Sequence, residues 1–204
     1  IDITINDIIP SSVSYVPDAY TFTKGASDST SIPTANGGPV VSWEIHPTLP
    51  NGLSIDSSSG QISGTPTTLS TIQTYTVYAN NTGGSATTTV DITVNDVIPS
   101  VITYSSSAFV ETRGSAMTTG IPTANGGPVD TWSISPPLPN GLSIDSSTGE
   151  ISGTPTVNSA LTTYTVTATN SGGDATTTID ITVNDIIPSS VTYTGSPYVE
   201  TKDS

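Results

Sequence analysis

Oxygen-bearing side chains recur at a fixed place in this sequence, directly before a short segment that contains proline. Asn95 and Asp96 precede Val97-Ile98-Pro99, and Glu111 follows about 15 residues after them. Hard cations such as Ca²⁺ take several oxygen ligands, which carboxylate and amide side chains supply. The spacing therefore predicts a calcium site built from Asn95, Asp96 and Glu111. A second copy of this site is predicted from Asn184, Asp185 and Glu200.

A second interpretation of the same segments needs no metal. Asn and Asp before a proline-containing segment are favourable turn residues, because their side chains bond to the nearby backbone. The copy of this region nearer the N-terminus carries Phe22 where the later copy carries Glu111, and a phenyl ring is no calcium ligand. At this point both interpretations, a calcium site and a turn, stay open.

Side chains that catalyse reactions are scarce in this chain. His46 is the one histidine, and its counterpart in the second copy of the repeat is Ser135. Acid–base and nucleophilic catalysis both require a positioned group that accepts a proton. Ser and Thr are abundant, but no such group recurs beside them. The sequence therefore predicts that this chain is not an enzyme.

Two further features concern sugars. The motif Asn80-Asn81-Thr82 has the pattern of an N-glycosylation acceptor, with Asn80 as the modified residue, and the second copy lacks it because it reads Asn170-Ser171-Gly172. Tyr20, Phe22 and Tyr78 would form an aromatic ligand surface on the first copy if they faced outward. The corresponding residues of the second copy are Phe109, Glu111 and Thr167.

The chain repeats itself with a period of 89 residues. Asp2-Ile3-Thr4 returns as Asp91-Ile92-Thr93, and about 55 of the 89 positions agree between the first two copies. Such repetition is typical of extended arrays, in which each unit adds length and resembles its neighbours. We place the boundaries at the proline-containing segments. The predicted parts are 1–7 (the last-strand tail of a preceding module), 8–96 and 97–185 (two Ig-like modules), and 186–204 (the opening strands of a following module).

Alternating sequence patterns predict β-strands, and no segment has the pattern of a helix. Residues 86–96 alternate apolar side chains with hydroxyl and acidic ones, which is typical of a half-buried strand. Gly83-Gly84 predicts a hairpin between this strand and the alternating residues 74–79. Short strands separated by turn residues every 8–12 residues or so predict a two-sheet antiparallel sandwich. Trp43 and Trp132 are the expected core anchors.

Charge and composition exclude several classes of partner. The net charge is −14 with three Lys and Arg residues, which argues against phosphate-rich nucleic acid and against anionic membrane surfaces. No apolar run approaches the roughly 18 residues that a membrane helix needs. Cysteine is absent, which excludes disulfides and cysteine-ligated metal sites. We therefore expect no nucleic-acid partner and no insertion of this segment into a membrane.

One long motif resembles a known family. The stretch from Trp132 to Pro155, WSISPPLPNGLSIDSSTGEISGTP, resembles the signature of the He-PIG family of Ig-like domains, and the first copy carries it from Trp43 to Pro66. The resemblance implies Ig-like sandwiches related to the cadherin-like group, which occur in tandem in large surface proteins of bacteria and archaea. The Asn95-Asp96 segment is likewise similar to the inter-domain Asn-Asp of cadherins, although their Asp-x-Asp motif is missing.

Together these patterns predict an all-β protein of tandem Ig-like antiparallel β-sandwiches arranged end to end. Short linkers that carry proline bend little, so we expect a stiff stalk or filament shaft that is extracellular or at the cell surface. Its partners would be further copies of the module, with self-assembly into a filament if segments 1–7 and 186–204 of neighbouring chains complement each other. The alternative is an adhesive module for a protein or glycan ligand, with calcium-stiffened junctions.

Overall fold

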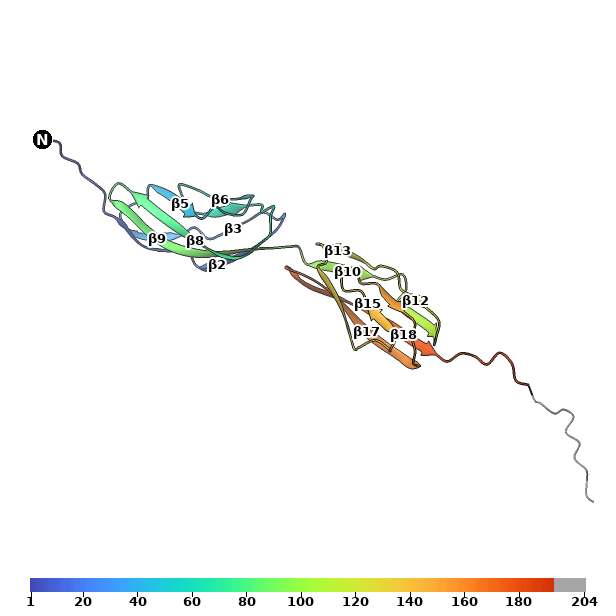
Figure 1. Cartoon of the computed structure of the whole chain (residues 1–204). Helices are drawn as coiled ribbons and strands as arrows, with labels where there is room; N and C mark the ends of the chain where they lie inside the picture. Colours follow the sequence, from blue (N-terminus) through green and yellow to red (C-terminus); the bar gives the residue numbers. More distant parts are fainter. Residues whose placement is uncertain (193–204) are drawn as a thin grey trace, which may run out of the picture. The chain divides into compact units, whose positions relative to one another are not determined.

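The computed structural model describes residues 1–192, which contain two modules of nine strands each and no helix (Figure 1). The first module consists of β1 (Pro10–Ser14), β2 (Ala19–Thr23), β3 (Asp28–Ser29), β4 (Thr34–Gly37), β5 (Ser42–His46), β6 (Leu53–Ile55), β7 (Ile62–Gly64), β8 (Ser70–Asn81) and β9 (Gly84–Asn95). The second consists of β10 (Pro99–Thr103), β11 (Ala108–Thr112), β12 (Met117–Thr118), β13 (Thr123–Gly126), β14 (Thr131–Ser135), β15 (Leu142–Ile144), β16 (Ile151–Gly153), β17 (Ser159–Asn170) and β18 (Gly173–Asn184). In the described part, no helix is long and apolar enough to cross a membrane.

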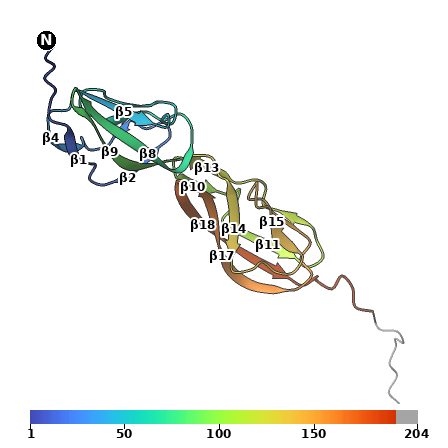
Figure 2. The ribbon, with the colours of Figure 1, turned by 60° about the vertical axis from the view of Figure 1, so that its left-hand side comes forward.

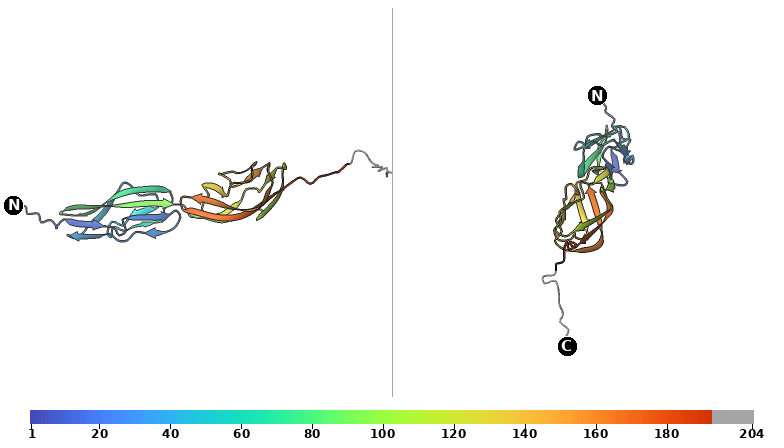
Figure 3. Two further views of the ribbon diagram at one scale, coloured as in Figure 1. Left: turned by 90° about the horizontal axis from the view of Figure 1, so that it is seen from below. Right: turned by 90° about the vertical axis from the view of Figure 1, so that its right-hand side faces the viewer.

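Each module is a sandwich of a larger and a smaller sheet. In the first module the larger sheet has the order β2-β9-β8-β5, the smaller has the order β3-β7-β6, and β1 pairs with β4. The second module repeats this arrangement as β11-β18-β17-β14, β12-β16-β15 and β10-β13. Figures 2 and 3 show the long β8–β9 and β17–β18 hairpins along one layer of each module. The predicted all-β sandwich fold is confirmed.

The predicted β8–β9 hairpin is present, and its antiparallel strands pair from Tyr75 opposite Val90 to Asn81 opposite Gly84. The strand β2 departs from a purely antiparallel sandwich, because it runs parallel to β9 from Ala19 opposite Asp91 to Thr23 opposite Asn95. The same parallel pairing joins β11 to β18. The chain is interrupted between β1, which pairs with β4, and β2, which pairs with β9. It does not reverse its direction at this break, so β2 runs parallel to the last strand.

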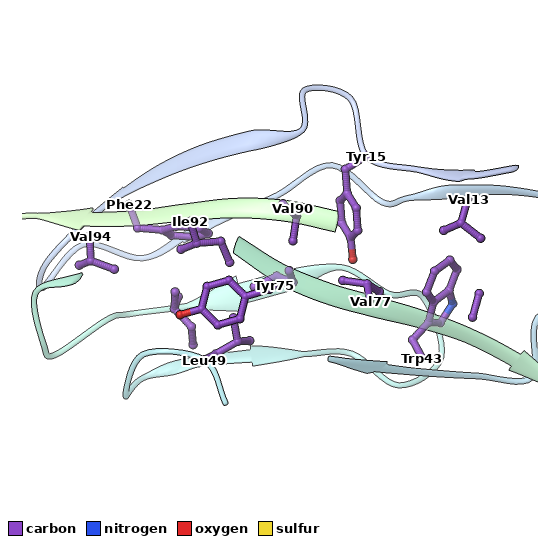
Figure 4. Packing of buried hydrophobic residues seen from close by; sticks show 13 residues of the cluster. Val13, Tyr15, Phe22, Trp43, Leu49, Tyr75, Val77, Val90, Ile92 and Val94 are labelled. Carbon is purple, nitrogen blue, oxygen red and sulfur yellow. The ribbon is translucent and has the colours of Figure 1, made fainter. Parts of the chain in front are cut away.

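The core lies between the two layers and contains the predicted tryptophans. Trp43 and Trp132 are each 6% exposed. Figure 4 shows that Phe22 lies with Ile92 and Val94 at one end of the first module's core, while Trp43 lies toward the other end. Alternation along β9 brings its apolar residues inward, as predicted, because successive side chains of a strand point to opposite faces.

The turn between β6 and β7 holds a short motif that recurs in both modules. The Asp56 carboxylate accepts the backbone N–H groups of Ser58 and Ser59, each at 2.8 Å. These bonds to the charged form lower the pKa of Asp56. Asp145 accepts the N–H groups of Ser147 and Thr148 in the same way. An Asx-type turn therefore closes this loop in both modules.

The segments outside the sandwiches carry no strand in the described part of the chain. Residues 1–7, expected as the last-strand tail of a preceding module, are extended, and Ile1, Ile3 and Ile5 are exposed. Their counterparts Val90 and Ile92 are buried because β2 and β8 flank them, and residues 1–7 have no such neighbours. Residues 193–204, which complete the predicted opening strands 186–204 and include Glu200, lie outside the described residues. The complementation of these two segments between chains and the module boundaries stay predictions.

Candidate functional site at the ends of each module

The C-terminal end of each module is closed by a cation and an acid, which we call the C-terminal clamp. In the first module the clamp consists of Lys24, Asn95 and Asp96, the residues that directly follow or end the parallel strands β2 and β9. The Lys24 N–H donates to the Asn95 carbonyl at 2.8 Å, and the Lys24 Nζ lies 3.7 Å from the Asp96 carboxylate. Because Asp96 is only 6% exposed, its charge is stabilised by the Lys24 ammonium group more than by bulk water.

The second module closes its C-terminal clamp with arginine. The Arg113 N–H donates to the Asn184 carbonyl at 2.8 Å, and the guanidinium Nη2 lies 2.7 Å from the Asp185 carboxylate. The Asn158 amide also donates to Asp185, at 3.2 Å. This amide bond, with a smaller contribution from Arg113, lowers the pKa of Asp185. Asp185 is exposed, so water screens this ion pair more than it screens the Lys24–Asp96 pair. The distance between its charged groups is shorter, which gives it the better hydrogen-bond geometry.

The N-terminal end of each module is held by a second set of contacts, which we call the N-terminal latch. In the first module the Asp7 N–H donates to the Thr82 hydroxyl at 2.9 Å, and that hydroxyl donates to the Asp7 carboxylate at 2.7 Å. The Asn81 amide donates to the Ile8 carbonyl at 2.6 Å and to the Pro39 carbonyl at 3.1 Å. These hydrogen bonds attach the segment that precedes β1 to the tip of the β8–β9 hairpin.

The same latch recurs at the start of the second module. The Asn170 amide donates to the carbonyls of Val97 and Pro128, at 2.7 and 2.9 Å, and the Asp96 N–H donates to the Ser171 hydroxyl at 2.9 Å. Glycine is required beside the incoming chain. A Cβ placed on Gly38 would overlap the Ile8 carbonyl oxygen, and one on Gly127 would overlap that of Val97. Sequence reasoning missed this latch, although the Asn-x-Gly-Gly pattern of both hairpins carried the signal.

The predicted calcium ligands are only partly brought together. The strand register places Glu111 opposite Val183, next to Asn184 and Asp185. It therefore lies at the C-terminal end of its module and not beside Asn95 and Asp96, where the sequence spacing had placed it. The reason is the parallel β11–β18 pair, which carries the chain along the whole module before Glu111 is reached.

Each clamp carboxylate already has a cationic partner. Residues 1–192 contain no group of three or more His, Cys, Asp or Glu side chains able to hold a metal ion. Lys24 and Arg113 stand where a bound cation would stand relative to Asp96 and Asp185. An ammonium or guanidinium group opposes a second positive charge nearby. The site residues present therefore fit an internal cation better than a calcium ion, and calcium binding stays a prediction.

The side chains considered for sugars and catalysis take part in neither the clamp nor the latch. Asn80 is half-buried on β8 and accepts a hydrogen bond from the Ser85 hydroxyl, and its glycosylation stays a prediction. Phe22 is 1% exposed, so it does not face outward and cannot belong to an aromatic ligand surface. Tyr20 donates to or accepts from Ser31 at 2.7 Å. His46 packs edge-on against Tyr78, with ring centres 5.8 Å apart.

Comparison with protein families gives a match over most of the chain. The profile of the family described as "Putative Ig domain" (He-PIG) matches residues 2–95 and 99–184. These two ranges contain all of β1–β9 and all of β10–β18. Both modules are therefore matched by the same profile.

Similar sequences occur in staphylococcal adhesins. The chain is 34% identical over 130 residues to the "Serine-rich adhesin for platelets" of Staphylococcus aureus, and 35% identical over 131 residues to the same adhesin of strain MRSA252. Each match covers 64% of this chain. The chain spans only 6% and 10% of the lengths of these two relatives.

Solved structures with a similar fold are tandem Ig domains. The extracellular domains 3–5 of Drosophila OTK match with a TM-score of 0.51 and 16% identity, covering 85% of this chain and 62% of that one. Immunoglobulin domains 1–4 of Sidekick-1 match with a TM-score of 0.50 and 15% identity, covering 90% and 51%. At such low identity these likenesses show the fold alone, which is a tandem of Ig-like sandwiches.

Proposed function

The chain belongs to the He-PIG family of Ig-like domains, and we propose that it is a force-resisting spacer within a cell-surface adhesin. The similarity to staphylococcal adhesins supports the surface location and the adhesin context. He-PIG domains are not known as enzymes, and we propose no catalytic role. The observation that carries the spacer role is the parallel pairing of an early strand with the last strand in both modules.

Parallel pairing decides how a module responds to tension along the chain. A pull on the N-terminus draws β2 backward along its own axis, and a pull on the C-terminus draws β9 forward along its axis. Because β2 and β9 are parallel neighbours, the two strands are then loaded in shear. All the backbone hydrogen bonds between them must yield together rather than one after another, which raises the force needed for separation.

The C-terminal clamp extends this parallel pair at its end. Lys24 adds a backbone bond to Asn95 and an ion pair to Asp96, directly after the last strand residues. At the other end of the pair the Asp91 N–H donates to the Asp18 carbonyl at 2.8 Å. Arg113 and the Asp180 N–H make the equivalent bonds in the second module. The sheared segment is therefore closed at both ends.

Single-molecule force measurements test the proposal. The chain is stretched by its ends, and its unfolding force is compared with those of Lys24→Gln and Arg113→Gln. We expect both substitutions to lower the force of one unfolding event. The equilibrium free energy of unfolding should change little in Arg113→Gln, whose partner Asp185 is exposed, and more in Lys24→Gln, whose partner Asp96 is buried. Glu44→Gln, on β5 and outside the parallel pair, is the matched control. Forces that stay the same in both clamp variants would contradict the proposal.

Calcium-stiffened ends of an adhesive module are the alternative. Its support is that Glu111, Asn184 and Asp185 lie at one end of the second module. Binding a cation only in the folded state raises the melting temperature. If about 5–10 mM calcium raises the melting temperature and the rise disappears in Asp185→Asn, this alternative is favoured. An unchanged melting temperature favours the clamp, in which Arg113 already neutralises Asp185.

A further inference from the structure

A cavity of about 240 Å³ opens at one end of the first module, between the chain after β5 and the start of β8. It is lined by Thr48, Leu49, Pro50, Asn51, Thr68, Leu69, Ser70, Gln73 and Tyr75. The volume is below the roughly 300–1,000 Å³ of pockets for drug-sized ligands. Its occupant must therefore be smaller than a typical drug molecule.

The lining of this cavity has no charged side chain, although the chain carries 17 Asp and Glu residues. Six of the nine lining residues carry a hydroxyl or amide group, so the wall offers both donors and acceptors. The other three, Leu49, Pro50 and Leu69, add little accessible apolar surface, and Leu49 is only 8% exposed, so the wall is mainly polar. A neutral pyranose matches this polar wall, because its hydroxyl groups both donate and accept hydrogen bonds. Leu69, which is 47% exposed, offers a contact for one C–H edge of the ring.

Hydrogen bonds hold parts of the wall in place. The Tyr75 hydroxyl donates to Gln73 Oε1 at 3.1 Å, which leaves the amide N–H groups of Gln73 as donors for a ligand. Tyr75 is itself 1% exposed, so its ring is fixed by the core. The Asn51 carbonyl accepts the Thr67 N–H at 2.8 Å. These contacts position the amide side of the cavity before any ligand binds, which reduces the entropy lost on binding.

The second module keeps the framework of this region and changes its lining. Leu138, Pro139, Asn140, Ser159 and Tyr164 are the same residue types as in the first module. The positions of Leu69 and Gln73 are taken by Asn158 and Thr162, and those of Thr48 and Thr68 by Pro137 and Val157. Asn158 donates to Asp185, so this position serves the C-terminal clamp there.

We propose that the cavity lined by Asn51, Ser70 and Gln73 in the first module is a binding subsite for a neutral sugar residue. Gln73 and Asn51 bind the sugar hydroxyl groups, and Leu69 contacts one C–H edge of the ring. Acidic sugars are disfavoured, because the lining offers no cation and the chain is strongly negative. The subsite gives the first module a ligand that the second lacks, independently of its response to force.

Protein-observed NMR of the ¹⁵N-labelled chain tests this inference. The probes are the methyl glycosides of glucose, galactose, mannose and N-acetylglucosamine, with glucuronic acid as the charged control. We expect at least one neutral glycoside to shift the backbone amides of Asn51, Ser70 and Gln73 saturably. A small, open cavity supports a Kd on the order of 1 mM. The amides of Asn140, Ser159 and Thr162 should stay unshifted.

Residues borrowed from the second module supply matched variants that should fold. Leu69→Asn with Gln73→Thr should weaken binding by about tenfold or more, because a hydrogen-bonding amide and an apolar contact are both lost. The reverse pair, Asn158→Leu with Thr162→Gln, should introduce shifts in the second module. No saturable shift with any neutral glycoside, equal shifts in both modules, or tighter binding of glucuronic acid would overturn the inference.

Discussion

The two modules share a backbone and differ in the residues that fill it. Phe22 on β2 is 1% exposed, whereas its counterpart on β11 is the half-buried Glu111. The reverse exchange occurs one strand later, where the exposed Asp28 of β3 corresponds to Met117 of β12, which is 7% exposed. Each module thus buries one large apolar side chain from this pair of strands. The sandwich therefore constrains the amount of buried apolar volume more tightly than the position of the side chain that supplies it.

Replacing Phe22 of the first module by glutamate, its counterpart in the second module, should cause the largest loss of stability. Phe22→Glu removes a buried ring and places a carboxylate at a 1% exposed position. We expect a loss of about 3–5 kcal/mol in the free energy of unfolding of the first module. Urea unfolding measures it, and Trp132→Phe in the background restricts the fluorescence signal to Trp43.

A compensating substitution sharpens this prediction. Adding Asp28→Met to Phe22→Glu should recover part of the loss, because it supplies the apolar side chain that Met117 provides in the second module. If the double variant is no more stable than Phe22→Glu alone, the two positions are not coupled and the volume argument is wrong.

Replacing the glycine that packs against each tryptophan should cause a smaller loss of stability, equal in the two modules. Gly60 and Gly149 have φ of 75° and 76°, and a Cβ on either would lie 2.6 Å from Cδ2 of Trp43 or Trp132. Replacing either by alanine should cost about 2–3 kcal/mol, from backbone strain and overpacking together. Chemical denaturation of Gly60→Ala and Gly149→Ala checks this. Clearly unequal losses would show that the shared backbone does not dominate here.

Alkaline pH should weaken both modules through a matching pair of buried tyrosines. The hydroxyls of Tyr15 and Tyr104 donate to the carbonyls of Gly60 and Gly149. Burial raises the pKa of both, that of Tyr104 to about 12. Since the folded state favours the protonated phenol, its contribution is complete below pH 10 or so and is lost as the pH rises toward 12.

Stability measured between pH 8 and pH 11 checks this titration. Tyr104→Phe cannot ionise, so the second module of this variant should lose less stability over the interval than that of the parent chain. The first module, which keeps Tyr15, serves as the internal control. A fall of the same steepness in the variant's second module would assign the alkaline loss to other groups.

The least change in stability is expected at a backbone position with positive φ, where only the second module has a β-branched residue. Val101 has φ of 46°, where β-branched residues are unfavourable, and its counterpart Ser12 has φ of 47°. Val101→Asn should stabilise the second module by about 0.5–1 kcal/mol, because asparagine tolerates this conformation and the side chain is exposed. Ser12→Val should destabilise the first module by a similar amount. Thermal unfolding of both variants tests the pair, and changes of the same sign would contradict the strain argument.

Strands and core anchors were the predictable part of this fold. The alternation over residues 86–96 identified β9, and Gly83-Gly84 identified the hairpin to β8, because a period of two is a local property of the sequence. Trp43 and Trp132 followed from the same reasoning. The face of the short strand β2 was not predictable, since Tyr20 and Phe22 are both aromatic and five residues do not distinguish the inward side.

The module ends were less predictable because they depend on pairing between distant residues. The register of β2 on β9 brings Lys24 to Asp96, and nothing near Lys24 in the sequence indicates that partner. The equivalent register of β11 on β18 places Glu111 at the end of β18 and not beside Asn95 and Asp96. In contrast, the Asn81 latch had a local signal, because Asn and Gly-Gly recur together in both hairpins.

The direction of pulling tests the central claim, that parallel strands resist tension in shear, most directly. The chain has no cysteine, so pairs of cysteine handles can be introduced without interference. Handles at Asp7 and Asn95 load β2 and β9 in shear, whereas handles at Asp18 and Asp91 lie side by side and unzip the same pair. We expect an unfolding force at least about twofold higher for the first pair, since its hydrogen bonds yield together. Equal forces in the two directions would contradict it.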